Sequence, residues 1–395
     1  MRGRLVIGAA AIAIAGSILW QGLRPRPLAA LPPVAPLPAA AAATAEPLPT
    51  PLPERLGEWI DAYVSALSRT RGEASAFNGY VMVARDGKPV FAKSYGLANR
   101  ETGAIADSDT RFRIGSITKQ FTAVAVLQLA ERGNLHLDDA LARYVPGLPF
   151  GDHVALYHLL TQTSGITSYT DVAALMKEHD KPHTRAQVLA SFADTPLAFE
   201  PGTQFQYSNS NYFLLGMVIE KTTGGSYEDY LQRNVLGPAG MTRTSTIDAP
   251  DAPNTAVGYT VRDGAIVPAG PVDMSLPFAA GALRSTPGDL VKWDRALAGD
   301  TLLGEASRRR MLSPMHDGYA YGVEVEAIAG RQVVEHNGGI NGFTSQLSRV
   351  PSEGLVVAVL SNIESHDPDQ IAEAILKMAL EGTEVPAAEW TQRGT

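Results

Sequence analysis

Apolar residues recur at helical spacing in several stretches of the chain. Between residues 54 and 70 the apolar positions follow the i, i+3, i+4 pattern of an amphipathic helix. A longer apolar helix is predicted over 117–132, where Gly133 supplies a residue typical of a helix C-terminus. Further helices are predicted over 185–193, 210–223, 227–235, 287–297 and 368–380.

Strand patterns lie near both ends of this folded part. Strands are predicted over 80–84 and 89–95, and Asp86-Gly87 between them is typical of a hairpin turn. Four more strands are predicted over 319–326, 332–336, 344–350 and 355–360. Because strands lie at both ends and helices between them, the expected fold class is α/β (α+β). We expect one antiparallel sheet built from both termini, flanked by helices, with an inserted mostly helical region.

The first 24 residues differ from the rest of the chain. Arg2 and Arg4 precede residues 5–23, which carry no charge, and Arg24 closes the stretch. This pattern predicts a signal peptide or an N-terminal membrane anchor over 1–24. The length of the uncharged stretch favours the anchor slightly, and both alternatives stay open. Residues 25–53 are mostly Pro, Ala and Leu, which predicts a semi-extended linker or a disordered tail left by signal cleavage.

Composition narrows the classes of partner. The chain has 395 residues, of which 45% are hydrophobic and 19% charged, as in a globular protein with a large core. Its net charge is −8, and it lacks a sustained basic run, so we expect no nucleic-acid partner. Residues 308–310 form the densest basic cluster and are expected on a solvated helix face. The chain contains no cysteine, which excludes disulfides and lipid attachment through a cysteine.

The segment Ser116-Ile117-Thr118-Lys119 is the first candidate for chemistry. At the start of a helix, residues i and i+3 lie on one face, so the hydroxyl and the amine come within reach of each other. The apolar run that follows, 122–130, predicts that this helix is buried. Burial and the positive end of the helix dipole both lower a lysine pKa. A neutral Lys119 can then accept the Ser116 proton. The structural alternative is a capping serine followed by a surface lysine.

Two further segments contain residues that are typical of active sites. Residues 200–212 contain Tyr207-Ser208-Asn209 in a turn that leads into a predicted helix, and the alternative role is helix capping. His336-Asn337-Gly338-Gly339 stands at the end of a predicted strand, and the alternative is a glycine-rich turn. A glycine pair there would also let a substrate lie against the backbone.

These three motifs, in this order, resemble the serine penicillin-recognising family. That family includes class C β-lactamases, DD-peptidases, D-aminopeptidases and family VIII-type carboxylesterases. The resemblance covers about residues 54–385 and also includes the segments 137–139, 159–166 and 280–286. It implies a β-lactamase/transpeptidase-like fold and a serine hydrolase domain over 54–385, followed by a tail over 386–395.

The resemblance also implies the reacting groups. Ser116 would be the acylated nucleophile. Lys119 and Tyr207 would share the general base and acid work, and which of them is the base stays open. Asn209 would hold Lys119 and a substrate carbonyl or amide. The backbone N–H groups of Ser116 and Gly339 would form the oxyanion hole.

The third motif departs from the commonest family pattern. Many members have lysine where His336 stands, and that cation meets a substrate carboxylate. Histidine is less reliably charged at neutral pH, which lowers our expectation of an efficient β-lactamase. Some DD-peptidases and D-aminopeptidases also have histidine there. His336 and Asn337 would line the edge of the site, with Gly338 beside them. Gln162 stands where the family often has histidine and is expected to be structural.

We expect no metal and no organic cofactor. His179 and His183 are four residues apart, but Pro182 lies between them, so a helical metal pair is disfavoured. The sequence has neither a His-Glu-x-x-His motif nor a phosphate-binding glycine loop.

The sequence therefore predicts an exported serine hydrolase that cleaves an ester or amide through an acyl-enzyme on Ser116. DD-carboxypeptidase-like and carboxylesterase-like activities lead, and a β-lactamase is the alternative. An inert protein that binds or senses cell-wall fragments is the alternative of another class. The expected partner is a small ester or peptide, with cell-wall peptides and β-lactams among the candidates. The location is periplasmic or extracellular, tethered to the membrane by residues 5–23 if that segment is not cleaved.

Overall fold

The computed structural model describes residues 49–70, 76–246 and 254–386. The predicted signal or anchor over 1–24, most of the predicted linker and nearly all of the predicted tail lie outside the described residues. The chain divides into two compact units, 1–45 and 46–395, and all described residues belong to the second. Within the described ranges, no helix combines the length and apolar character needed to span a bilayer.

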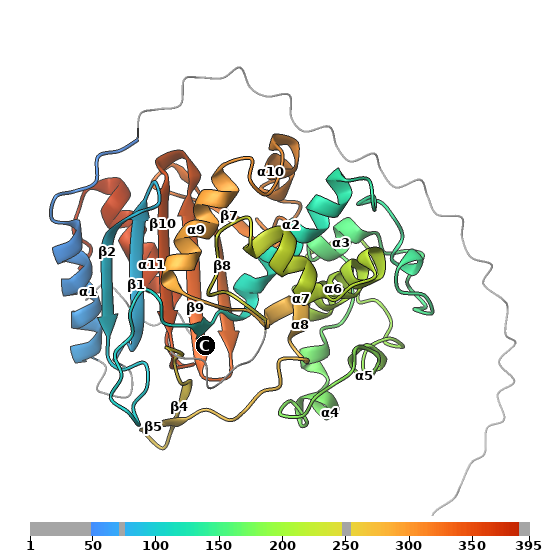
Figure 1. Ribbon diagram of the computed structural model, residues 1–395, viewed down its shortest axis with the longest axis horizontal. Coiled ribbons are helices and arrows are strands. Elements are labelled where there is room, and N and C mark those ends of the chain that lie inside the picture. The colour runs from blue at the N-terminus through green and yellow to red at the C-terminus, as the bar shows by residue number, and fades with distance from the viewer. Residues whose placement is uncertain (1–48, 71–75, 247–253, 387–395) are drawn as a thin grey trace, which may run out of the picture. The chain divides into compact units, whose positions relative to one another are not determined.

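The second unit is organised around a six-stranded antiparallel sheet with the order β2-β1-β10-β9-β8-β7 (Figure 1). Its strands are β1 Gly79–Arg85, β2 Lys88–Tyr95, β7 Glu324–Ile328, β8 Arg331–Ile340, β9 Phe343–Val350 and β10 Leu355–Ser361. The N-terminal hairpin turns at Asp86 and Gly87, both of which have positive φ, as the sequence predicts. β1 pairs with the C-terminal strand β10, so both ends of the described chain build the sheet. The predicted fold class is confirmed.

Both faces of the sheet are covered, and the strands reflect this in their sequence. Residues 79–84 of β1 are all buried, because successive side chains enter opposite cores. Val81 and Val83 join a core formed with the helices α1, Leu56–Thr70, and α11, Pro368–Glu381. Tyr80 and Met82 join the larger core on the helical side. A strand buried on both faces is apolar throughout, whereas a strand with one solvated face alternates.

The inserted region is mostly helical. Its helices are α2 Thr118–Glu131, α3 Leu156–Leu160, α4 Ala173–Met176, α5 Arg185–Ala190, α6 Asn209–Thr223, α7 Tyr227–Leu231, α8 Phe278–Gly281, α9 Pro287–Ala298 and α10 Glu305–Met311. A π-helical turn, Gln232–Leu236, follows α7. Helix α2 is buried over residues 118–129, as expected of a helix that is apolar on all sides. It ends before Gly133, which has φ 71°.

Short elements complete the insert. Two-stranded pieces are formed by β3 Phe112–Arg113 with β6 Arg284–Ser285, and by β4 Tyr259–Arg262 with β5 Ala265–Pro268. Among the described residues, 3-10 turns occur in the insert at Gly115–Ile117, Leu141–Arg143 and Tyr169–Asp171, and between β9 and β10 at Pro351–Glu353.

Two strand predictions are wrong at their ends. The strand predicted over 319–326 begins only at Glu324, because Tyr319 closes a turn with His316 and Gly322 has φ 73°. A Cβ at Gly322 would lie 2.7 Å from the Lys119 carbonyl oxygen, so this segment packs against α2 instead of pairing as a strand. The strand predicted over 332–336 continues to Ile340 as β8. Its glycine pair therefore lies within a strand, opposite Ser345 and Thr344 of β9.

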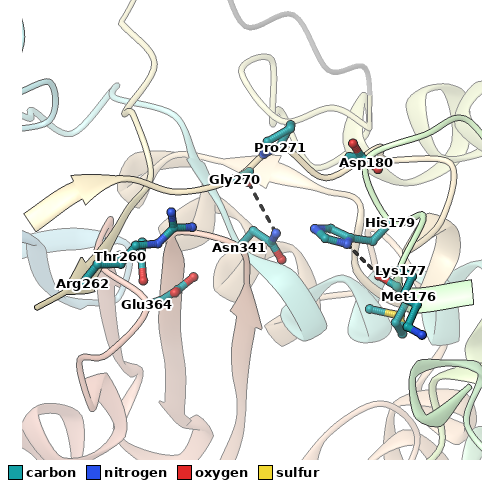
Figure 2. A pocket seen from close by; sticks show the side chains of 10 residues that line it. All are labelled: Met176, Lys177, His179, Asp180, Thr260, Arg262, Gly270, Pro271, Asn341 and Glu364. Atoms are coloured by element: carbon teal, nitrogen blue, oxygen red, sulfur yellow. Dashed lines mark hydrogen bonds between the residues drawn. The ribbon is translucent and has the colours of Figure 1, made fainter. Parts of the chain in front are cut away.

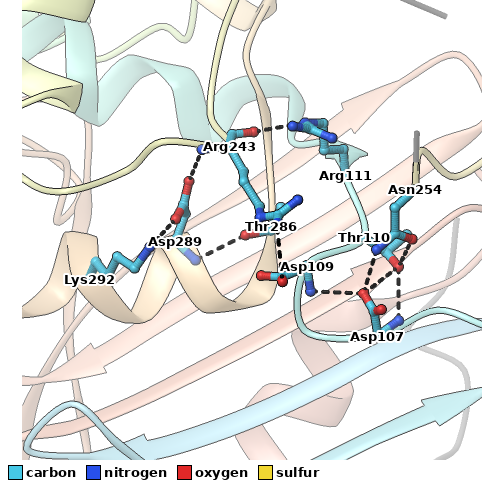
Figure 3. Close-up of polar contacts among 9 residues, drawn as sticks. All are labelled: Asp107, Asp109, Thr110, Arg111, Arg243, Asn254, Thr286, Asp289 and Lys292. Carbon is cyan, nitrogen blue, oxygen red and sulfur yellow. Dashed lines mark hydrogen bonds and ion pairs between the residues drawn. The ribbon is translucent and has the colours of Figure 1, made fainter. Parts of the chain in front are cut away.

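A polar network fastens the segment before Ser116 to helix α9 (Figure 3). Asp289 is buried and accepts hydrogen bonds from the Arg243 backbone and the Thr244 hydroxyl, each at 2.9 Å. Arg243 also forms an ion pair with Asp109 at 3.3 Å. Thr110 joins the network through its hydrogen bond to Asn254 at 2.6 Å. The network holds the chain that leads through β3 to the Ser116 turn.

Candidate active site

Ser116 lies in the 3-10 turn Gly115–Ile117 that leads into helix α2. Gly115 has φ 49°, which a residue with a side chain rarely adopts. A Cβ at Gly115 would lie 2.9 Å from both the backbone nitrogen and the carbonyl oxygen of Gly339. The backbone of the turn therefore touches strand β8, and Ser116 stands at the junction of α2 and the sheet.

Lys119 is fully buried one helical turn after Ser116, with 0% of its surface exposed. Its Nζ atom lies 2.8 Å from Ser116 Oγ, 2.8 Å from Asn209 Oδ1 and 2.9 Å from the Ala280 carbonyl oxygen. Burial disfavours the ammonium form and lowers the Lys119 pKa well below its usual value. The expected pairing of hydroxyl and amine is therefore present in the structure.

The hydrogen-bonding capacity of the three partners of Lys119 is that expected around a neutral amine. Two of them, the Asn209 side-chain oxygen and the Ala280 carbonyl, can only accept hydrogen bonds. A neutral amine has two N–H groups for these acceptors and one lone pair left for a donor. The remaining partner is the Ser116 hydroxyl, which can donate. The geometry thus allows the serine proton to point at the amine lone pair.

Tyr207 lies on the other side of the Ser116 hydroxyl. Its ring centroid is 4.8 Å from Lys119 Nζ, and its hydroxyl lies near enough to Ser116 for that neighbour to influence the Tyr207 pKa. The residue as a whole is 36% exposed. The hydroxyl itself lies in crowded surroundings, whose desolvation raises the Tyr207 pKa above its usual value. Tyr207 therefore carries its proton at neutral pH.

Asn209 is the first residue of α6, and neighbouring loops fix its position. Its backbone N–H donates to the Ser168 hydroxyl at 3.1 Å, and its side-chain amide lies 3.4 Å from the Thr170 hydroxyl. Gln162 accepts from the Ser208 backbone at 3.0 Å through its side-chain oxygen. Gln162 lies outside the cavity wall and braces this segment, as expected for a structural residue.

The strand β8 has a free edge beside the Ser116 turn. Its pairing with β7 ends at Glu335, whereas its pairing with β9 continues to Ile340. Gly338 is pressed against the chain before Ser116, because a Cβ there would lie 2.1 Å from the Ile114 carbonyl oxygen. Gly339 has open space around its Cβ position and lines the cavity. The backbone of Gly339 is thus available to a group bound at Ser116.

A cavity of about 150 Å³ opens at Ser116. Polar side chains reach it from Ser116, Asn209 and Asn341, while much of the wall is apolar. The remaining lining residues are Tyr169, Thr170, Met176, Val272, Leu276, Pro277, Ala280, Gly281, Gly339 and Ile340. None of these side chains carries a charge, so the cavity suits an uncharged and partly apolar group.

The structure places His336 inside the protein, with 1% of its surface exposed. It packs against the Tyr207 ring, with ring centroids 6.1 Å apart, but does not line the cavity. Burial lowers the His336 pKa to about 3. Asn337 is exposed on the opposite side of the strand and does not line the cavity either. Of the four residues 336–339, only Gly339 reaches the cavity wall.

Several supporting residues were missed from the sequence. The Ala280 carbonyl contacts Lys119, and the Ala280 segment was noted only as similar to the family. Ser168 and Thr170 belong to a loop whose contact with Asn209 depends on tertiary folding. Tyr319 was assigned to a strand, whereas its hydroxyl contacts His336. Only the Ala280 segment carried a pattern that pointed to the site.

The rings of His179 and His183 have backbone partners. His179 Nδ1 lies 2.7 Å from the Met176 carbonyl oxygen, and His183 Nε2 lies 2.9 Å from that of Glu178. Among the described residues, no group of three or more His, Asp or Glu side chains is placed to hold a metal ion.

An antiparallel sheet with a buried Ser-x-x-Lys turn against strand β8, faced by a Tyr-x-Asn segment, defines the class of serine penicillin-recognising proteins. The family description that matches residues 60–380 is Beta-lactamase, and the chain belongs to that family. The recognition made from the three motifs is thereby confirmed.

Known relatives agree with this assignment. The chain is 28% identical over 340 residues to penicillin-binding protein 4* of Bacillus subtilis, covering 80% of this chain and 74% of that protein. It is structurally similar to the octameric penicillin-binding protein homologue from Pyrococcus abyssi, with a TM-score of 0.74, 30% identity and coverage of 82% and 77%. A D-stereospecific amidohydrolase from Streptomyces matches with a TM-score of 0.68, 27% identity and coverage of 82% and 99%.

Proposed function

We propose that the protein is a serine hydrolase that cleaves an ester or amide through an acyl-enzyme on Ser116. The observation that carries the proposal is the buried Lys119, whose Nζ lies 2.8 Å from Ser116 Oγ with two carbonyl acceptors on its other sides. A buried amine beside a serine at a helix start has little structural value of its own. Its value is chemical, because it makes the hydroxyl a nucleophile.

The proposed reaction has two steps. Ser116 Oγ attacks the substrate carbonyl carbon while its proton passes to Lys119 Nζ. The backbone N–H groups of Ser116 and Gly339 stabilise the resulting oxyanion. The bond to the leaving group breaks as that group takes the proton, and an acyl-enzyme remains. Water then attacks the ester carbonyl, which releases the acid and returns the proton to Ser116.

The pKa shifts favour Lys119 as the base and Tyr207 as the proton donor. Burial lowers the Lys119 pKa, so its amine is ready to accept a proton. Burial raises the Tyr207 pKa, so its phenol keeps a proton that it can pass to the leaving group. Lys119 contacts the Ser116 hydroxyl and Tyr207 lies near it, which allows the proton to move between them.

The cavity supports a substrate that is uncharged next to the scissile bond. No lining side chain of the 150 Å³ cavity carries a charge, and His336 is buried with a pKa of about 3. A leaving group with a free carboxylate would therefore enter without a cation to meet it. Carboxylesterase-like or amidase-like activity follows, and the similar Streptomyces protein is itself named an amidohydrolase. DD-carboxypeptidase and β-lactamase activities are less favoured, because their substrates carry a carboxylate close to the scissile bond.

The inert binding protein is the second candidate. A protein that only holds cell-wall fragments needs neither the neutral lysine nor its contact with Ser116. Since Lys119 contacts both the Ser116 hydroxyl and Asn209, and Tyr207 lies next to both Ser116 and Lys119, the geometry supports turnover instead. We also propose that the protein acts outside the cytoplasm, as the pattern over 1–24 and the similarity to penicillin-binding proteins suggest.

The test combines turnover with trapping of the intermediate. Residues 46–395, wild type and Ser116→Ala, are mixed with 4-nitrophenyl butyrate, and nitrophenolate release and intact mass are followed together. The proposal expects turnover and a transient butyryl adduct on the wild type alone. The same assay is then run on N-acetyl-D-alanyl-D-alanine and its C-terminal amide. Faster cleavage of the free acid than of the amide contradicts the uncharged leaving group, and equal ester turnover in Ser116→Ala contradicts the nucleophile.

A further inference from the structure

A second pocket, of about 570 Å³, adjoins the catalytic cavity (Figure 2). The two share Met176 and Asn341 in their walls, so one bound molecule can occupy both. The walls of the second pocket come from the α4 region, from strand β4 and from the turn between β8 and β9. Unlike the catalytic cavity, this pocket is lined by charged side chains.

Two basic and two acidic side chains stand in this wall, and the basic ones are Lys177 and Arg262. Arg262 and Lys177 line the pocket, and within the described ranges neither forms an ion pair. The ring of His179 is held through Nδ1 by the Met176 carbonyl, which leaves Nε2 for a ligand. Figure 2 shows Asn341 between Arg262 and His179. These cationic and N–H donor groups, Arg262 foremost, are the ones in the pocket that can bind an anionic group.

Two acidic residues also line the pocket, and one of them has a partner. Glu364 accepts a hydrogen bond from the Gly342 backbone at 2.9 Å through Oε2, which ties it to the turn that carries Asn341. Asp180 is exposed on the rim. These carboxylates limit the negative charge that the pocket can take, so it suits one carboxylate better than a phosphate or a polyanion.

The position of the second pocket determines how far a group bound there lies from the carbonyl that Ser116 attacks. Asn341 follows Gly339 by two residues, which is about 7 Å along an extended chain. Gly339 lies at the Ser116 turn and Asn341 in the wall of both cavities. A group bound by Arg262 therefore lies several bonds away from the carbonyl attacked by Ser116.

We propose that this pocket binds a carboxylate at the far end of the substrate, with Arg262 as its principal partner and His179 and Asn341 beside it. The planar guanidinium matches a carboxylate with two parallel hydrogen bonds. The inference rests on the proposed function and names its substrate class: an ester or amide that is neutral at the scissile bond and carries a carboxylate several bonds away.

The test uses two esters of equal length. Mono-4-nitrophenyl suberate carries a terminal carboxylate, and its methyl ester is the uncharged counterpart. For the wild type we expect a KM about fivefold lower for the carboxylate, as for a solvent-exposed ion pair with added hydrogen bonds. Arg262→Gln should remove this preference, so that the ratio of the two KM values falls to about one. Glu364→Gln should increase the preference. Arg233→Gln, which changes an exposed arginine of the π-helical turn, is the matched control and should behave as wild type.

A binding measurement separates the two proposals. Ser116→Ala is titrated with suberate in a calorimeter, alone and combined with Arg262→Gln. Binding that requires Arg262 supports the pocket whether or not the esters are cleaved. Hydrolysis of both esters with equal KM, or suberate binding unaffected by Arg262→Gln, overturns the pocket inference alone. Absence of Ser116-dependent hydrolysis of either ester, with the fold intact, overturns the proposed function.

Discussion

The hydroxyl of Tyr319 lies 3.2 Å from Nε2 of His336. The other ring nitrogen, Nδ1, lies 2.6 Å from the Asn337 carbonyl oxygen, which can only accept. Nδ1 therefore carries the proton, and Nε2 accepts from Tyr319. This pair holds His336 as a neutral ring beside Tyr207, and burial keeps its pKa near 3. His336, which was expected to line the edge of the site, instead packs as a neutral ring against Tyr207.

The neutrality of His336 predicts how the pH profile responds to its replacement. Since His336 does not titrate above about pH 3, His336→Gln should leave the acidic limb of kcat/KM at the same pH as in the wild type. Its rate is expected to fall through the misplacement of Tyr207. Tyr319→Phe serves as the companion variant and should have the same profile shape. An acidic limb that disappears in His336→Gln would show that the imidazole titrates during catalysis.

Lys119 should control that acidic limb. Its pKa is lowered by burial, and below that pKa the amine is protonated and cannot accept the Ser116 proton. We expect kcat/KM to fall as pH decreases and to level off above the Lys119 pKa. Lys119→Met should reduce kcat by about 10² to 10⁴, the usual size of a general-base contribution. Lys221→Met, at an exposed position of α6, is the control. Near-normal turnover by Lys119→Met would contradict the prediction and would indicate Tyr207 as the general base.

The uncharged cavity predicts poor reaction with penicillins. Benzylpenicillin carries a carboxylate close to its reactive amide, and the cavity at Ser116 has no charged side chain to meet it. Its methyl ester lacks that charge. We expect the methyl ester to acylate Ser116 faster than the free acid, as measured by intact mass over time, with Ser116→Ala as the blank. Faster labelling by the free acid would mean that a cation outside the cavity wall reaches the carboxylate.

The two glycines of β8 should differ sharply in their tolerance of a side chain. A Cβ at Gly338 would lie 2.1 Å from the Ile114 carbonyl oxygen, whereas a Cβ at Gly339 has nothing within 4 Å. Gly338→Ala should lower the free energy of unfolding by about 1–3 kcal/mol and reduce turnover, because the Ser116 turn must shift. Gly339→Ala should keep the stability of the wild type. Thermal unfolding and ester turnover of both variants check this contrast, and equal stabilities would contradict it.

Glu335 predicts a pH dependence of stability. Burial raises its pKa from 4.5 to about 7, with Glu326 and Glu324 adding to the shift and Ser348 opposing it. A group whose folded-state pKa is raised stabilises the fold below its unfolded pKa, and this contribution is lost as pH rises toward 7. Glu335→Gln should therefore be more stable than the wild type at pH 8, by about 2 kcal/mol after allowance for partial exposure. Both should have similar stability near pH 4. Chemical unfolding at the two pH values measures this.

The sequence predicted the parts of the fold that depend on local pattern. Helix α2 was visible as an apolar run closed by Gly133, and the first hairpin was visible from Asp86-Gly87. The predicted strand over 332–336 ended before Gly338 and Gly339, because glycine pairs are typical of turns. Only the pairing with β9, which is a tertiary contact, keeps these residues in the strand.

The site could be predicted as far as its motifs reach. The contacts of Lys119 with Ser116 and Asn209 could be expected, because the sequence contains the family motifs in which these residues lie. The environment of His336 could not be predicted, since its neutrality depends on Tyr319 from another segment and on burial. The pocket around Arg262 combines residues from widely separated parts of the chain, and no spacing in the sequence indicates that they meet.

The pairing of β1 with β10 has a consequence for the order of events during synthesis. β10 joins the N-terminal hairpin to β9, and its residues 355–361 leave the ribosome only after the whole helical insert. Until then the strand that pairs with both β1 and β9 is missing. Strand β8, which lies against the Ser116 turn, therefore belongs to an incomplete sheet. The nascent chain therefore stays without its central sheet and its nucleophile site for most of translation.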